Sequence, residues 1–184
     1  MTFLLIFLSF AAVWELRDFW QFRWYKIEKL NIKIMKIKIP IKSHDKLKNQ
    51  GHLGGDILHY KNSPKDCPIV IFSHGFSDNS SITRYITGVL AIAGFDVLSY
   101  DMRGVGRSKK VGNRHQFKEI VKDFEDILNY INNNSKFNGK DLYLVGFSLG
   151  TIPTLFHVLR ESKIKKAVVI STIANFKDIV PRSP

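Results

Sequence analysis

The chain has 184 residues, of which 45% are hydrophobic and 12% aromatic, and this composition excludes an intrinsically disordered protein. The length suits one domain with a core of its own. The net charge of +12 is compatible with an anionic partner, either nucleic acid or an anionic membrane surface. The single cysteine, Cys67, excludes an internal disulfide framework and fits a reducing compartment; we interpret it as a small packed residue near the start of a strand.

Residues 1–25 form a hydrophobic and aromatic N-terminal segment, whose first 14 residues carry no charged side chain. A helix of that length spans about 21 Å, less than the hydrocarbon core of about 30 Å. Three interpretations stay open: a signal-peptide core, a short membrane anchor extended by the aromatic residues up to Tyr25, and a helix packed on the domain. We favour membrane association, with the remaining domain, residues 26–184, on the cytosolic side.

A lysine-rich stretch follows this segment and supports the same interpretation as a juxtamembrane basic region. Its members are Lys26, Lys29, Lys33, Lys36, Lys38, Lys42, Lys46 and Lys48. A solvated lysine-rich surface without a partner is the competing interpretation. No recognised nucleic-acid-binding module accompanies the charge, so we expect no nucleic-acid partner.

The first predicted strands form an antiparallel hairpin. Residues 37–42 alternate apolar and polar side chains, and Pro40 marks them as an edge strand. Ile32 and Ile34 fall on the opposite phase, which predicts a bulge near Met35. Residues 46–55 have turn chemistry, and residues 56–60 are predicted to return as the second strand.

From residue 69 onward, predicted strands alternate with predicted helices. Apolar runs predict strands over residues 69–75, 95–100, 142–145 and 166–171, and apolar stripes predict helices over residues 82–93, 117–131 and from the region of residue 151 to residue 160. This order is typical of βαβ units. The expected fold class is α/β, with a mostly parallel sheet, helices on both faces and an N-terminal antiparallel hairpin.

The strand over residues 142–145 runs directly into Gly146-Phe147-Ser148-Leu149-Gly150, after which a helical pattern begins. This is the G-x-S-x-G pattern of a nucleophile elbow in its strand–turn–helix context. A serine in a strained turn needs neighbours without a Cβ atom, and the helix N-terminus below it favours developing negative charge. An ordinary strand-to-helix turn is the competing interpretation.

Three predicted strand ends carry residues suited to chemistry, at the edge where parallel sheets bind ligands. They are Ser73-His74-Gly75-Phe76, residues 101–108, and Ser148. With these motifs in this order, residues 68–171 resemble the N-terminal half of the α/β-hydrolase superfamily, and most closely its serine aminopeptidase/monoacylglycerol-lipase-like branch. The resemblance implies hydrolysis of small-molecule or lipid esters, or of amides, without a cofactor.

The resemblance also implies residue roles. Ser148 would be the nucleophile that forms an acyl-enzyme, and the backbone N–H groups of Leu149 and Phe76 would form the oxyanion hole. Gly146 and Gly150 would shape the elbow, while His74 and Gly75 would support it, the histidine having a structural role.

Residues 101–108 have two interpretations. Gly104 and Gly106 after a strand suggest a dinucleotide fingerprint, but Lys109 occupies the third glycine position. The resemblance favours the D-x-R-G-x-G-x-S loop of the family, which implies a structural turn rather than catalysis. Its matching residues are Asp101, Arg103, Gly104, Gly106 and Ser108.

The acid and the histidine of a catalytic triad are not in their usual positions. In this fold they follow the nucleophile, yet His157 is the single histidine after Ser148, and its place in the next helix prevents a return to the hydroxyl. Asp178 could be an acid in a variant arrangement. We therefore predict a C-terminally incomplete chain that is nearly inactive alone. Thr151 and Pro153 depart from the family pattern and put the tightness of the elbow packing in question.

The histidines show no H-x₃-H or H-E-x-x-H spacing, so we predict no metal site. Two alternatives to a serine hydrolase remain: a catalytically inactive pseudo-hydrolase that acts as a membrane-surface binding module, and a basic binder of nucleic acid or lipid headgroups. In each case the final strand, residues 167–171, would leave an apolar sheet edge exposed, which predicts aggregation of the isolated chain.

Overall fold

The computed structural model describes residues 30–42, 51–113 and 115–172. The N-terminal segment of residues 1–25, part of the lysine-rich stretch and Asp178 lie outside these ranges, so their interpretations stay predictions. Among the described residues, no helix combines the length and apolar character needed to cross a membrane.

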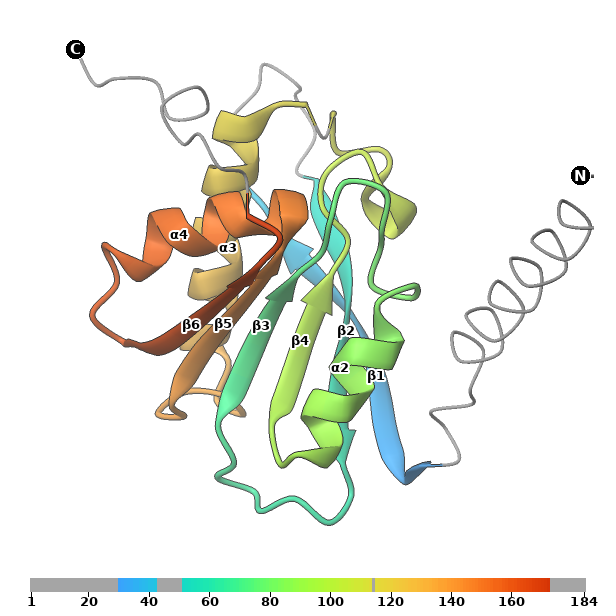
Figure 1. Cartoon of the computed structure of the whole chain (residues 1–184), viewed down its shortest axis with the longest axis vertical. Helices are drawn as coiled ribbons and strands as arrows, with labels where there is room; N and C mark the ends of the chain where they lie inside the picture. The colour runs from blue at the N-terminus through green and yellow to red at the C-terminus, as the bar shows by residue number, and fades with distance from the viewer. Residues whose placement is uncertain (1–29, 43–50, 114, 173–184) are drawn as a thin grey trace, which may run out of the picture.

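Six strands of the described chain form one sheet in the order β1-β2-β4-β3-β5-β6 (Figure 1). Their bounds are Ile32–Pro40 (β1), His52–Tyr60 (β2), Ile69–Ser73 (β3), Asp96–Tyr100 (β4), Leu142–Phe147 (β5) and Ile164–Ile170 (β6). β1, β2 and β4 pair antiparallel, whereas β4, β3, β5 and β6 run parallel. The predicted fold class, a mostly parallel sheet preceded by an antiparallel hairpin, is confirmed.

Helices cover both faces of this sheet. The longer helices are α2 (Arg84–Ile92), α3 (Phe117–Asn133) and α4 (Thr151–Val158), and two 3₁₀ turns, η2 (Gly106–Ser108) and η3 (Ser148–Gly150), follow strand ends. α3 and α4 share one core with the sheet, whereas α2 packs in a second core on the other face. Figure 1 shows α2 in front of the sheet and α3 behind it.

The helical stripes were predicted with different success. In α3 the expected apolar residues Ile120, Phe124 and Ile127 are buried. In α2, however, Val89, which belongs to the apolar stripe of residues 82–93, is 61% exposed. The buried side of this short helix consists instead of Thr87, Gly88 and Ala91. Small side chains let the helix lie close to the sheet. A prediction from the spacing of large apolar residues does not detect this kind of buried face.

The predicted bulge near Met35 is wrong. β1 pairs with β2 in one unbroken register from Ile32 opposite Tyr60 to Pro40 opposite His52. Ile32 is buried in the core below α2, whereas Ile39 is buried in the core below α3. The change of phase therefore reflects a long strand that buries opposite faces at its two ends, and needs no inserted residue.

The turn predicted up to residue 55 is also wrong at its end, because β2 already begins at His52 and contains Gly54 and Gly55. A Cβ atom on Gly54 would lie 2.4 Å from the Arg107 Cβ atom, and one on Gly55 would lie 3.0 Å from the Ser99 carbonyl oxygen. These two glycines therefore do not form a turn. They allow Arg107 and the Ser99 backbone to pack closely against β2.

β6 is the last strand of the sheet in the described chain, and it is poorly covered. Its apolar side chains Val168, Val169 and Ile170 are 54%, 37% and 40% exposed. The exposed apolar edge expected from the sequence is present among the described residues, and aggregation through it remains a prediction.

Candidate active site

The candidate site lies where the neighbouring parallel strands β3 and β5 end (Figure 1). Ser73, the last residue of β3, lies opposite Gly146 of β5. The loop that begins with His74 and the turn that contains Ser148 therefore leave the sheet side by side. This arrangement brings two of the three sequence motifs together at the carboxyl edge of the sheet.

Ser148 has a strained backbone conformation. Its φ angle is +49°, in the left-handed region that residues other than glycine seldom adopt. It begins η3, which continues directly into α4. The Thr151 hydroxyl donates a hydrogen bond of 2.7 Å to the Ser148 carbonyl oxygen and so ties the strained residue to the helix. A serine held in this way between a strand and a helix has the geometry of a nucleophile elbow.

Both elbow glycines lie where a Cβ atom does not fit. A Cβ atom on Gly150 would be 2.0 Å from the Ser73 carbonyl oxygen, and one on Gly146 would be 2.6 Å from the Gly150 carbonyl oxygen and from the Thr154 hydroxyl. The contacts on Gly150 are all with backbone atoms, which cannot rotate away. Strand, turn and helix thus approach one another so closely that the motif depends on glycine at these two positions.

The two departures from the family pattern fit the elbow without loosening it. Thr151 is fully buried and makes the hydrogen bond to Ser148 described above. Pro153 is the third residue of α4, inside the first turn, where a backbone N–H has no partner within the helix. Proline is tolerated better in this first turn than in the interior of a helix.

The predicted oxyanion donors border the same space. Leu149 follows Ser148 in η3, and Phe76 follows Gly75 in the loop after β3. A Cβ atom on Gly75 would lie 3.1 Å from the Phe147 ring, so this loop packs directly against the residue before Ser148. The Phe76 ring is partly exposed and lies 5.2 Å, between ring centroids, from the ring of His115. The sequence did not indicate this contribution of His115 to the edge of the site.

His74 is completely buried and uses both ring nitrogens within the protein. Its Nε2 atom accepts a 2.9 Å hydrogen bond from the backbone N–H of Met102, so Nδ1 carries the proton and donates to the Gly75 carbonyl oxygen at 2.6 Å. The imidazole thus joins the loop after β3 to the loop after β4. With both nitrogens engaged in this way, it is poorly suited to take a proton from Ser148.

The loop after β4 is a network of buried ionic and polar groups. The Asp101 carboxylate accepts hydrogen bonds from the backbone N–H and hydroxyl of Ser80 and from the backbone N–H and guanidinium of Arg107. Burial alone would raise the pKa of Asp101, but these hydrogen bonds outweigh it and hold the pKa below its usual value. The network fixes the loop over residues 76–83, which carries the second predicted oxyanion donor.

Two further contacts complete this support. Arg103 forms a buried bidentate pair with Asp123 of α3, with N–O distances of 2.7 and 2.6 Å. Ser108 donates a hydrogen bond to the Asp101 carbonyl oxygen and accepts one from the Gly54 N–H. The hydrogen bonds of Asp101, Arg103 and Ser108 join this loop to the neighbouring segments, as expected of a structural turn. The sequence did not indicate that Asp56 belongs to the same network, through ion pairs with Arg84 and Arg107.

Among the described residues, none forms a hydrogen bond with the Ser148 hydroxyl, and two further histidines are engaged away from it. His157 lies in α4, where its Nε2 atom is 3.0 Å from the Val121 carbonyl oxygen and its ring stacks on Phe124. Burial lowers the pKa of His157. His59 pairs with Asp96 at the opposite end of the parallel strands. His44 and Asp178 lie outside the described residues.

Comparison with known proteins identifies relatives of this arrangement. The family described as serine aminopeptidase, S33 matches residues 64–183. The chain is 28% identical over 122 residues to a bifunctional esterase/perhydrolase from Acinetobacter calcoaceticus, covering 65% of this chain and 42% of that protein. It is 32% identical over 85 residues to epoxide hydrolase B from Mycobacterium tuberculosis, covering 45% of this chain and 22% of that protein.

Solved structures show the same fold at lower identity. An esterase from Pyrococcus furiosus superposes with a TM-score of 0.65 at 18% identity, covering 83% of this chain and 56% of the esterase. An esterase from Exiguobacterium antarcticum gives a TM-score of 0.58 at 19% identity, covering 76% and 46% of the two chains. The chain thus spans less than two thirds of the length of these relatives.

Proposed function

Because the chain belongs to the serine aminopeptidase S33 family of α/β-hydrolases, we propose that it is a serine hydrolase that cleaves carboxylic esters or amides through an acyl-enzyme at Ser148. The observation that carries this proposal is the elbow: a serine with a φ angle of +49°, placed between two glycines whose Cβ positions are occupied by other atoms. Ser171, directly after β6, has a similar φ angle of +53°, so the angle alone does not identify a nucleophile. The two glycines that let strand, turn and helix approach one another at Ser148 are the feature that a nucleophile elbow requires.

In the proposed reaction, the Ser148 Oγ atom attacks the carbonyl carbon and its proton passes to a general base. The carbonyl oxygen becomes an oxyanion, which the N–H groups of Leu149 and Phe76 stabilise. The tetrahedral intermediate then expels the alcohol or amine, which takes up the proton, and water hydrolyses the acyl-enzyme. We assign the base and its acid partner to residues outside the described ranges, because His74, His157 and His59 are each engaged with other groups.

A fluorophosphonate probe tests this proposal, since it labels an activated serine covalently. We expect the native gene product to be labelled and to hydrolyse p-nitrophenyl esters, and Ser148→Ala to abolish both. Ser77→Ala is the matched control, because Ser77 is an exposed serine in the neighbouring loop and should leave labelling unchanged. Labelling that persists in Ser148→Ala would contradict the assignment of the nucleophile.

A second candidate is a catalytically inactive pseudo-hydrolase that binds a membrane surface. The exposed side chains of Lys33, Lys36 and Lys38 on the edge strand β1 support contact with anionic lipid. Co-sedimentation with vesicles containing phosphatidylserine tests this idea. Salt-sensitive binding together with no fluorophosphonate labelling would favour the second candidate, whereas labelling at Ser148 would exclude it. Vesicle binding by a labelled protein would instead place the hydrolase at the membrane.

A further inference from the structure

A second cluster of reactive side chains lies at the opposite end of the parallel strands from Ser148. It joins His59 near the end of β2, Cys67 in the turn before β3, and Asp96 at the start of β4. One potential ligand atom from each residue lies within 4.8 Å of the other two. The three residues are far apart in the sequence, so local histidine spacing could not indicate this cluster.

Hydrogen bonds already organise the cluster around the Asp96 carboxylate, whose side chain is 1% exposed. One carboxylate oxygen is 2.6 Å from the His59 Nδ1 atom, and the other is 2.7 Å from the Lys140 ammonium. The same ammonium lies 3.8 Å from the Cys67 sulfur. A cationic group thus occupies the position between a carboxylate and a sulfur, with an imidazole nitrogen next to it.

We propose that His59, Cys67 and Asp96 form a binding site for a divalent transition-metal ion of the zinc type, for which the Lys140 ammonium is a built-in competitor. Imidazole nitrogen, thiolate sulfur and carboxylate oxygen are the three ligand types that Zn²⁺ takes in proteins. Tetrahedral zinc holds its ligand atoms about 3.3–3.8 Å apart. The His59 Nδ1 and Asp96 atoms, now 2.6 Å apart, would have to separate, and any pair near the 4.8 Å limit would have to approach, in each case by side-chain shifts of about 1 Å. Water would complete the coordination.

Charge explains why the ion would displace the lysine. The ammonium balances the buried carboxylate alone, whereas a divalent ion balances the carboxylate and a thiolate together. Cys67 is buried next to the Asp96 carboxylate, surroundings that favour a neutral thiol in the metal-free cluster. Metal binding then releases the thiol proton to water and leaves Lys140 protonated.

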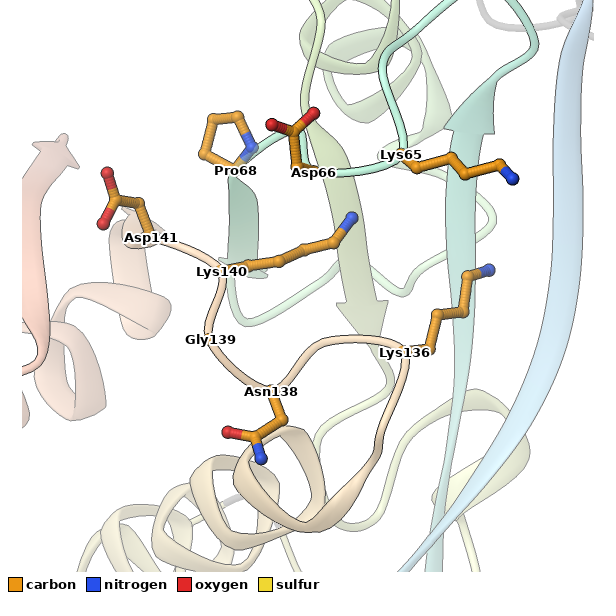
Figure 2. Close-up of a pocket in the computed structure, with 8 residues that line it drawn as sticks. All are labelled: Lys65, Asp66, Pro68, Lys136, Asn138, Gly139, Lys140 and Asp141. Carbon is orange, nitrogen blue, oxygen red and sulfur yellow. The ribbon is translucent and has the colours of Figure 1, made fainter.

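The structure also provides a place for the displaced ammonium. Lys140 lines an open pocket of about 550 Å³, together with Lys65, Lys136, Asp66 and Asp141. Figure 2 shows the Lys140 side chain extending across this pocket from the loop before β5. Rotation of the side chain alone can therefore move the ammonium toward solvent and toward the carboxylates in the pocket. His59, which is 24% exposed, lies on the accessible side of the cluster.

Titration of the untagged full chain with Co²⁺ tests the proposal, because a tetrahedral cobalt–thiolate site gives an intense near-ultraviolet charge-transfer band. We expect one Co²⁺ per chain, with a band that Zn²⁺ removes by displacement. Cys67→Ser should abolish the band. His59→Ala, which removes a ligand, should weaken binding by more than the roughly 10–100-fold that loss of an outer-shell partner costs. Because the readout is spectroscopic, the result does not depend on hydrolase activity.

The competitor role of Lys140 makes a second, opposite prediction. Lys140→Met should bind Co²⁺ roughly tenfold more tightly than the unmodified chain, whereas Lys65→Met, in the same pocket but outside the cluster, should leave affinity unchanged. A band that survives Cys67→Ser, or no binding by the unmodified chain, would overturn the proposal, as would an affinity unaffected by Lys140→Met. Circular dichroism verifies that each variant folds; if Lys140→Met does not, the unmodified chain and Cys67→Ser decide the question.

Discussion

Replacement of Gly150 by alanine tests the elbow most directly. The added Cβ atom would lie 2.0 Å from the Ser73 carbonyl oxygen, 2.5 Å from the Ser73 carbonyl carbon and 2.9 Å from the His74 carbonyl oxygen. All three atoms belong to the backbone at the end of β3, so no side chain can rotate to make room. Since Cβ atoms essentially never come closer than 3.0 Å to other heavy atoms, the helix and the strand must separate by about 1 Å.

This separation has two calculable consequences. Overpacking of a dense core typically lowers the free energy of unfolding by about 1–3 kcal/mol. Because the opposing atoms belong to rigid backbone, we expect Gly150→Ala to lower it by about 3 kcal/mol or more. That is a large share of a total unfolding free energy of about 5–15 kcal/mol. A displacement of about 1 Å also moves the Leu149 N–H away from the developing oxyanion, which typically costs about 10²-fold in rate.

Urea denaturation followed by circular dichroism measures the first effect, and fluorophosphonate labelling rate measures the second. Gly51→Ala is the matched control, because its Cβ atom would meet only the side chains of Ile41 and Val111 at 3.5–3.6 Å. We expect that control to change the unfolding free energy by less than about 0.5 kcal/mol. If Gly150→Ala were as stable and as quickly labelled as Gly51→Ala, the close approach of α4 and β3 would be refuted.

Three further predictions concern the oxyanion hole, a buried histidine and the sheet edge. Phe76→Pro, which removes a backbone N–H, should slow labelling and ester hydrolysis about 10²–10³-fold, whereas Phe76→Ala, which keeps the N–H, should not; equal effects would exclude this N–H as a donor. Because burial lowers the pKa of His157 from 6.5, the unfolded chain binds a proton that the folded chain does not, so the unfolding free energy should fall as pH drops below about 6.5. His157→Gln should flatten this slope in urea titrations at several pH values, and an unchanged slope would assign it to other groups. The isolated chain should self-associate through β6. Light scattering should show less association for Val168→Lys but no change for Val89→Lys, a similarly exposed site on α2 (54% and 61% exposed, respectively). Equal behaviour of the two variants would argue against an edge contact.

Much of the fold could be predicted from local patterns. The apolar stripe of α3 and the apolar run of β3 each report the side that a helix or strand buries, because periodicity follows directly from backbone geometry. The face that β1 buries was less predictable. β1 buries Ile32 on one face and Ile39 on the other, and this exchange depends on which helix lies over each end of the strand.

The candidate site shows the same division. The elbow around Ser148 could be predicted from the sequence because it is a local motif, with a strained φ angle and two glycines within five residues. The hydrogen bonds of His74 could not be predicted in the same way, because one of the two groups that its ring nitrogens contact is distant in the sequence. This group, the Met102 N–H, lies 28 residues away in the chain.

The sequence by itself determined the alternation of strands and helices, the elbow and the family resemblance, since each depends on residues close together in the chain. Only the tertiary structure decided the buried network of Asp101, Arg107 and Asp56 and the cluster of His59, Cys67 and Asp96. These groups meet because strand order places distant segments side by side. Strand order results from the burial of whole helices and strands against one another, which no short stretch of sequence records.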